Sequence, residues 1–87
     1  MRAIITVIGT DKTGIIAKVS GLCFEKNINI LDITQTIMQE FFTMVMLVDL
    51  KNAQYDEVSR ELDALAGELG VTIRMQHEDI FNSMHKI

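Results

Sequence analysis

The stretch GTDKTGIIAKVS, Gly9 to Ser20, decides the fold of this chain. It follows residues 2–9, an apolar and β-branched run that predicts a strand, and leads into residues 15–26, whose apolar spacing predicts a helix. A short turn from a strand into a helix directs backbone N–H groups and the positive end of the helix toward one place. Such a place suits a carboxylate or a phosphate group.

The glycine spacing in this stretch resembles the beginning of a nucleotide-binding phosphate loop, because four residues separate Gly9 from Gly14. However, Ile15 and Ile16 follow where that loop requires Lys and then Ser or Thr. The stretch therefore argues against nucleotide hydrolysis and predicts a small anionic or zwitterionic ligand.

Length and composition predict one soluble globular domain over residues 1–87, 48% of them hydrophobic. The net charge is −4 and the Lys and Arg residues are spread singly, which argues against a nucleic-acid partner. One cysteine, Cys23, cannot form an internal disulfide, so a cytoplasmic location is expected. The N-terminal apolar run ends at Gly9, too early for a signal peptide or a membrane span.

Two further strands are predicted in the middle of the chain. Residues 27–39 alternate between apolar and polar, which predicts a half-buried strand at the edge of a sheet. Its apolar side carries Leu31, Ile33 and Ile37, and its polar side carries Asp32, Thr34 and Thr36. Residues 41–48 are apolar on both sides, as residues 2–9 are, and both runs therefore predict central strands with two covered faces.

The last third of the chain predicts a helix, a strand and a helical tail. Residues 55–69 carry an apolar helical stripe that follows a candidate N-cap, Asn52, and stops at Gly70. Residues 71–76 alternate and predict a second edge strand. The tail, residues 78–87, could form an amphipathic helix of about two turns, too short to be stable without docking on something.

The order βαββαβ predicts an α+β, ferredoxin-like sandwich: a four-stranded antiparallel sheet with two helices on one face and a short C-terminal helical tail. The first and third strands would be central and the second and fourth would be edges. The other face of the sheet would need the tail or another subunit to cover it. A stripe of small residues on the first helix, with Ala17, Ser20, Gly21 and Phe24, would admit either the domain's other helix or a helix of a second copy.

No catalytic set of residues appears, and no cofactor or metal is expected. Cys23 lies on the core stripe of the first helix, which predicts packing and not reactivity. His77 and His85 flank two acidic residues, a pattern that fits either a metal site or solvated tail residues. The chain is therefore expected not to be an enzyme, with acyl or phosphoryl chemistry as the remaining alternative.

The run VIGTDKTGIIAKVSGLCFEKNINILDITQT, residues 7–36, resembles the ACT-domain family, with its D-x-x-G-I/L loop, its helix and its N-I start of the second strand. EFFTMVMLVDL resembles the third strand of the branch that contains the glycine-cleavage repressor and formyltetrahydrofolate deformylase. The resemblance covers a core of residues 2–77. It implies a regulatory module that binds amino acids or similar small metabolites at dimer interfaces, usually attached to an enzyme or a transcription factor.

Carried over by position, the resemblance implies ligand contacts at Gly9, Asp11 and Asn29, with Gly14 forming the turn. Gly9 has no side chain where some members place a histidine, Asp11 replaces an amide, and Thr13 stands where proline is common. The candidate ligand-binding residues are Gly9, Thr10, Asp11, Lys12, Thr13, Gly14, Ile15, Asn29 and Ile30. Asp11 or Thr13 could instead cap the first helix, and Asn29 could only satisfy backbone groups.

The loop and Asn29 flank a helix of about twelve residues, about 18 Å long at 1.5 Å per residue. One subunit cannot hold a small amino acid with both, whereas a twofold dimer formed through the second strand and the first helix can. The first hypothesis is therefore a free-standing, metabolite-sensing homodimer that signals through a partner protein. The alternative is a ligand-free interaction module that uses its apolar sheet face and its Met-rich third strand.

Overall fold

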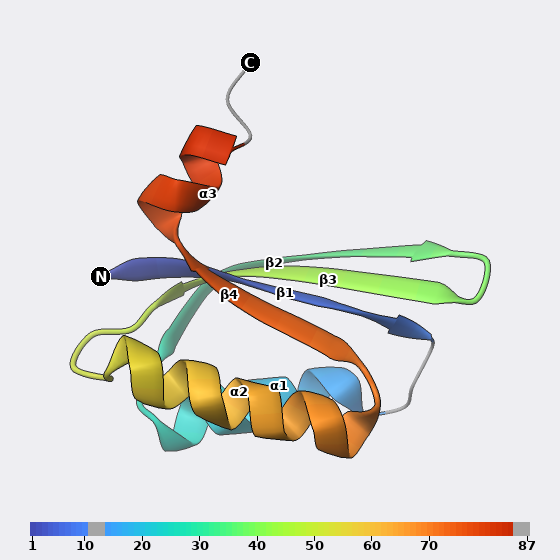
Figure 1. Cartoon of the computed structure of the whole chain (residues 1–87), viewed down its shortest axis with the longest axis horizontal. Coiled ribbons are helices and arrows are strands. Elements are labelled where there is room, and N and C mark those ends of the chain that lie inside the picture. The colour runs from blue at the N-terminus through green and yellow to red at the C-terminus, as the bar shows by residue number, and fades with distance from the viewer. Residues whose placement is uncertain (11–13, 85–87) are drawn as a thin grey trace.

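The computed structural model describes residues 1–10 and 14–84 of the chain. Its elements follow the predicted order, with a helix after the last strand, and the predicted ferredoxin-like fold is thereby confirmed (Figure 1). They are β1 (Arg2–Thr10), α1 (Ile15–Glu25), β2 (Asn29–Met38), β3 (Phe41–Asp49), α2 (Tyr55–Leu69), β4 (Thr72–His77) and α3 (Glu78–Met84).

The four strands form one antiparallel sheet in the order β2-β3-β1-β4. The two runs that are apolar on both sides, β1 and β3, are its central strands, as predicted. Figure 1 shows α1 and α2 side by side under one face of the sheet, and α3 on the opposite side. The core between the sheet and the two helices contains Ile5, Val7, Val19, Cys23, Met44, Met46, Val58 and Leu62, all buried.

The edge strand β2 is less covered than its alternating pattern predicts. Every residue of β2 is exposed except Ile30, which is half-buried, so the predicted half-buried strand is wrong for the single chain. The buried side chains of α1 pack with those of β1, β3 and β4, and no residue of β2 belongs to the buried core. Ile37, on the side that faces the helix layer, is 64% exposed.

A register shift in β2 changes which residues share a face. The ladder with β3 pairs Ile30 with Val48 and then Asp32 with Leu47, so Leu31 has no partner. Because of this bulge, Ile30 lies on the same face as Ile33, three residues further on. Simple alternation would have placed the two on opposite faces.

The ends of α2 agree only in part with the prediction. Gln54 and not Asn52 occupies the N-cap position, and no side chain caps the helix there. The buried Leu50 accepts a hydrogen bond from the Ala53 N–H (2.9 Å), and this turn occupies the residues that were expected to begin the helix. The predicted stop is confirmed, since Gly70 adopts a left-handed conformation (φ 69°) that ends α2.

The helix α3 forms part of the predicted tail, and it docks on its own chain. It lies against β1 and β4, and the Arg2 guanidinium is 2.9 Å from the Glu78 carboxylate. It covers only one end of the open sheet face, because Ile8, toward the other end of β1, is 47% exposed. Within residues 1–10 and 14–84, no helix is long and apolar enough to cross a membrane.

Candidate functional site

The predicted ligand loop joins the end of β1 to the start of α1. Gly9 and Thr10 end the strand, and Gly14 is the N-cap residue of the helix. Gly14 has φ 90° and its carbonyl accepts the Lys18 N–H at 2.9 Å, which explains why glycine makes this turn. Asp11, Lys12 and Thr13 lie outside the described residues, so their predicted capping and ligand roles remain predictions.

A hollow of about 490 Å³ lies beside this loop. Gly14 and the first turn of α1 form one side, and Gln35 and Ile37 of β2 form the other. Phe42 of β3, which pairs with Ile37, also lines the hollow. Ile15 is buried in the core, so its side chain is part of the packing.

Gln35 was not predicted as a site residue, although the sequence contains a signal for it. It interrupts the apolar side of the second strand between Ile33 and Ile37. In the structure it pairs across the ladder with the buried Met44, on the face covered by the helices. A polar side chain at such a position contributes hydrogen-bonding groups to an otherwise apolar hollow.

The other two candidate residues, Asn29 and Ile30, lie at the far end of the sheet. Asn29 pairs with Asp49, whereas Thr10 pairs with Phe41 at the opposite end of β3. Eight residue steps of an antiparallel strand correspond to about 27 Å. Within one chain, the loop and Asn29 are therefore not brought together.

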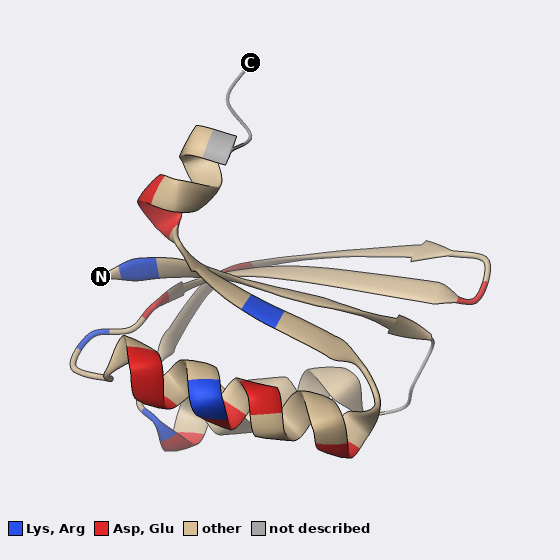
Figure 2. Cartoon of the chain, in the orientation of Figure 1, with Lys and Arg blue, Asp and Glu red and all other residues tan. Residues whose placement is uncertain are grey.

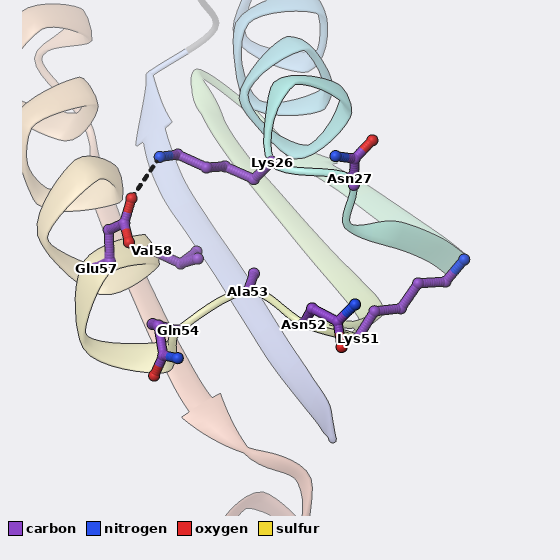
Figure 3. A pocket seen from close by; sticks show the side chains of 8 residues that line it. All are labelled: Lys26, Asn27, Lys51, Asn52, Ala53, Gln54, Glu57 and Val58. Carbon is purple, nitrogen blue, oxygen red and sulfur yellow. Dashed lines mark hydrogen bonds and ion pairs between the residues drawn. The ribbon is translucent and has the colours of Figure 1, made fainter.

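Two further hollows lie near the end of α1, and the smaller of them reaches the start of β2. The larger one, about 300 Å³, lies where the end of α1 meets the turn into α2 (Figure 3). Lys26 lines this hollow, and its ammonium group donates a hydrogen bond to Glu57 at 2.7 Å and forms an ion pair with Glu61. These carboxylates raise the pKa of Lys26, the bond to Glu57 contributing most. Its charge is thus already matched within the protein.

Lys51 lies close to Asn29, and sequence reasoning did not single it out. The two residues line a smaller hollow of about 250 Å³ together with Phe24 and Asn27. Figure 3 shows the Lys51 side chain extending toward the start of β2. Its backbone has φ 53°, and its N–H donates to Asp49 Oδ1 at 3.0 Å. No pattern in the sequence predicted this left-handed turn.

The sequence also singled out Cys23, His77 and His85 as chemical candidates. Cys23 is fully buried, as predicted, and desolvation raises the pKa of its thiol. Nδ1 of His77 accepts a hydrogen bond from the Asp79 N–H (3.4 Å), while His85 lies outside the described residues. Among the described residues, no group of three or more His, Cys, Asp or Glu side chains could hold a metal ion.

Most of the stripe of small residues on α1 is exposed. Ala17, Gly21 and Phe24 are exposed, and no atom lies within 4 Å of a Cβ built on Gly21. Ser20, the fourth stripe residue, is half-buried, and α1 and α2 contact each other, so contact with the domain's other helix stays a prediction for that part of the stripe. Contact with a second copy stays a prediction.

Comparisons with known proteins agree with this architecture. The ACT domain family model matches residues 2–76. A UPF0237 protein of Clostridium acetobutylicum is 58% identical over 89 residues, covering all of both chains. An ACT domain protein from Streptococcus pneumoniae has a similar structure, with a TM-score of 0.83, 44% identity and 93% of each chain covered.

Solved structures similar to this chain also include members of the branch named from the sequence, which contains the glycine-cleavage repressor and formyltetrahydrofolate deformylase. A candidate glycine cleavage system transcriptional repressor superposes with a TM-score of 0.78 and 26% identity, over 88% of this chain and 47% of that one. A formyltetrahydrofolate deformylase from Burkholderia mallei, 16% identical with a TM-score of 0.79, shares the fold over 86% of this chain and 27% of its own. This protein therefore belongs to the ACT domain family.

Proposed function

We propose that this protein is a non-catalytic, cytoplasmic regulatory module that binds an amino acid or a similar small metabolite at a homodimer interface. Its signal would pass to a partner protein. ACT domains are in general regulatory modules that bind ligands, so the specific proposal concerns where the ligand lies and what completes its site. The observation that carries it is the exposed edge strand β2 beside the hollow at the start of α1.

The strand β2 has the properties of an edge that is paired in solution. It is ten residues long, and its exposed apolar side chains include Leu31, Ile33, Ile37 and Met38. Its one charged residue is Asp32. Long apolar edges without charges are open to further strand pairing, and natural proteins cover or block them. A second copy of β2, antiparallel to the first, would cover this edge.

This pairing would also complete the ligand site. In an antiparallel pair, the start of one β2 lies beside the end of the other. Met38, at the end of β2, pairs with Phe41, which pairs with Thr10 at the ligand loop. Asn29 of the partner subunit would thus lie at the same end of the sheet as the loop and the 490 Å³ hollow.

The expected ligand contacts follow from the chemistry of the two halves. Backbone N–H groups near Lys12 to Ile15 would hold the carboxylate, and Asp11 would attract the ammonium group. The partner subunit's Asn29 would supply directional hydrogen bonds. Ile37 and Phe42, which line the hollow, would contact an apolar side chain of the ligand.

The test is calorimetry and thermal-shift screening against the common amino acids. A saturating ligand at 100 times its dissociation constant should stabilise the native state by about 2.7 kcal/mol. Asn29→Ala and Asp11→Ala should weaken the hit, whereas Asn82→Ala and Asp63→Ala, which remove the same groups from exposed positions on α3 and α2, should not. No hit, or a hit that neither site variant changes, would count against the proposal.

A second candidate function is a ligand-free interaction module that uses the open sheet face. Ile8, Met38 and Phe41 are exposed there, which favours a contact surface. Met44 and Met46 are fully buried, so the Met-rich strand cannot form it. Stoichiometric recovery of one partner protein by the metabolite-free homodimer, abolished by Phe41→Lys, would favour this candidate.

A further inference from the structure

We propose that the open face of the sheet carries a second small-molecule site, beneath α3, for a carboxylic acid with an apolar body. This site lies on the opposite face from α1 and α2 and uses none of the residues of the proposed dimer site. It consists of a hollow of about 380 Å³ between the sheet and the tail helix.

The register of the sheet aligns the central residues of this hollow. Thr6 of β1 pairs with Val45 of β3 on one side and with Arg74 of β4 on the other. All three line the hollow, and Ile8 extends its floor along β1. Phe81 of α3 forms a wall. Three neighbouring strands thus provide a rigid base, and one aromatic ring stands beside it.

Arg74 gives the site its charge preference. Ile4, Thr6 and Ile8 face six residues on the neighbouring strands, of which only Arg74 is charged. Within the described part of the chain, no ion pair or hydrogen bond involves its guanidinium group, whereas Arg2 is paired with Glu78 and Lys26 with Glu57. Five of the eleven acidic residues that the structure describes lie on α2, in the helix layer on the other side of the sheet (Figure 2). Two others, Glu78 and Asp79, lie in the first turn of α3, where Glu78 is paired with Arg2.

The residue types in the hollow specify the ligand class. A guanidinium group binds a carboxylate through two parallel hydrogen bonds, and Thr6 and Thr72 offer hydroxyl groups on the same face. Ile8, Val45 and Phe81 offer apolar contact to the rest of the molecule. The volume is near the lower end of that of small-molecule sites, which fits a compact acid with one ring or one branched chain.

Arg74 could instead serve only to protect the edge strand β4 from pairing, because charged side chains on sheet edges have that effect. The two roles differ in what they require. Protection of an edge requires a charge at that position and no particular anion. A ligand site requires the guanidinium group, the hollow and a negatively charged group on the bound molecule.

The experiment is a titration of the full chain with phenylacetate, followed by amide chemical shifts. Phenylacetamide, which has the same apolar body without the charge, is the matched probe. Phenylacetate should shift the amide signals of Thr6, Val45 and Arg74. Phenylacetamide should bind at least about tenfold more weakly than phenylacetate, because the charge-assisted hydrogen bonds would be lost.

Three variants complete the test. Arg74→Gln should weaken phenylacetate binding at least about tenfold, whereas Arg60→Gln, which removes an equal charge from the exposed side of α2, should leave it unchanged. Thr72→Phe should block the hollow, since Thr72 is an exposed residue at its rim. Arg74→Lys keeps the charge but loses the two parallel hydrogen bonds of the guanidinium group, so it should also weaken phenylacetate binding. It serves as the test variant if Arg74→Gln fails to fold.

Specific outcomes would overturn the proposal. Equal binding of both probes, or affinity unchanged in both Arg74 variants, would show that the guanidinium group does not hold a carboxylate. Absence of shifts on the open face, whether through lack of affinity or because a second copy covers it, would show that no such site exists. Asn29→Ala should weaken amino-acid binding at the proposed dimer site and leave phenylacetate binding at the open face unchanged. Failure of one proposal can therefore be told apart from failure of the other.

Discussion

Gly9 and Val71 are so close that a Cβ atom on Gly9 would lie 2.6 Å from Cγ1 of Val71 and 3.1 Å from its Cβ. Val71 follows the end of α2 and packs against the core. The absence of a side chain at position 9 is therefore required by packing between the end of β1 and the start of β4. A larger residue at position 9 would have to displace Val71.

Gly9→Ala should destabilise the protein by about 1–3 kcal/mol, the usual cost of forcing an extra carbon into a packed contact. Urea unfolding provides the measurement. The double variant Gly9→Ala with Val71→Ala should be less destabilised than the sum of the two single variants, since removing the valine methyls opens the space. Additive effects in the double variant would show that the contact with Val71 is not the cause.

Gly14→Ala should destabilise the protein by about 1–2 kcal/mol, because the left-handed conformation at φ 90° is costly for a residue with a Cβ atom. No atom lies within 4 Å of a Cβ built there, so the cost is conformational and not steric. Gly67→Ala is the matched control, also with free space around it but inside α2. It should stabilise the protein by roughly 0.5–1 kcal/mol, and the two thermal shifts should differ in sign.

Ile37→Lys should dissociate the proposed homodimer by placing a charge on the apolar edge of β2. Its 64% exposure leaves room for the lysine in the single chain, so folding should be unaffected. The dimer dissociation constant should rise roughly tenfold or more, because a charge would be desolvated on pairing. Ile80→Lys, at a 56% exposed position on α3, is the control. Sedimentation velocity at micromolar concentration distinguishes them, and equal behaviour of both variants would argue against β2 pairing.

Lys26 should make the stability of the protein depend on pH. Its hydrogen bond lowers the pKa of Glu57 from the ordinary value of 4.5. Since the folded-state pKa lies below the unfolded one, the contribution is complete above pH 4.5 and is lost as the pH falls through the lowered pKa. Lys26→Met should therefore be less stable than the wild type at neutral pH.

Urea midpoints measured at neutral and at strongly acidic pH provide the test of this linkage. The difference between Lys26→Met and the wild type should shrink as Glu57 becomes protonated. Lys18→Met, which removes a lysine from the exposed side of α1, should show no such pH dependence. A Lys26→Met difference that stays constant across the range would mean that the ion pair is fully screened by solvent.

The architecture could be predicted because its signals are local. Residues 2–9 and 41–48 are apolar on both sides, and only central strands bury both faces. Gly14 and Gly70 marked the start and the end of helices through their backbone freedom. The predicted cap at Asn52 failed because Asn52 lies inside a local turn, in which the Ala53 N–H donates to the Leu50 carbonyl. Leu50 is buried in the core, and this tertiary burial is not visible in a cap pattern.

The sequence by itself thus determined the order of the strands, the burial of Cys23 and the glycines at which the chain turns, because each follows from periodicity or from a single residue's conformational range. Only the tertiary structure decided which side chains meet. It left β2 uncovered, brought Gln35 into one hollow with Gly14 of the predicted ligand loop, brought Lys51 into one hollow with Asn29, and aligned Arg74 with Thr6 and Val45. Those relationships depend on strand register and on where the helices lie, and neither can be predicted from the spacing of residues along one strand.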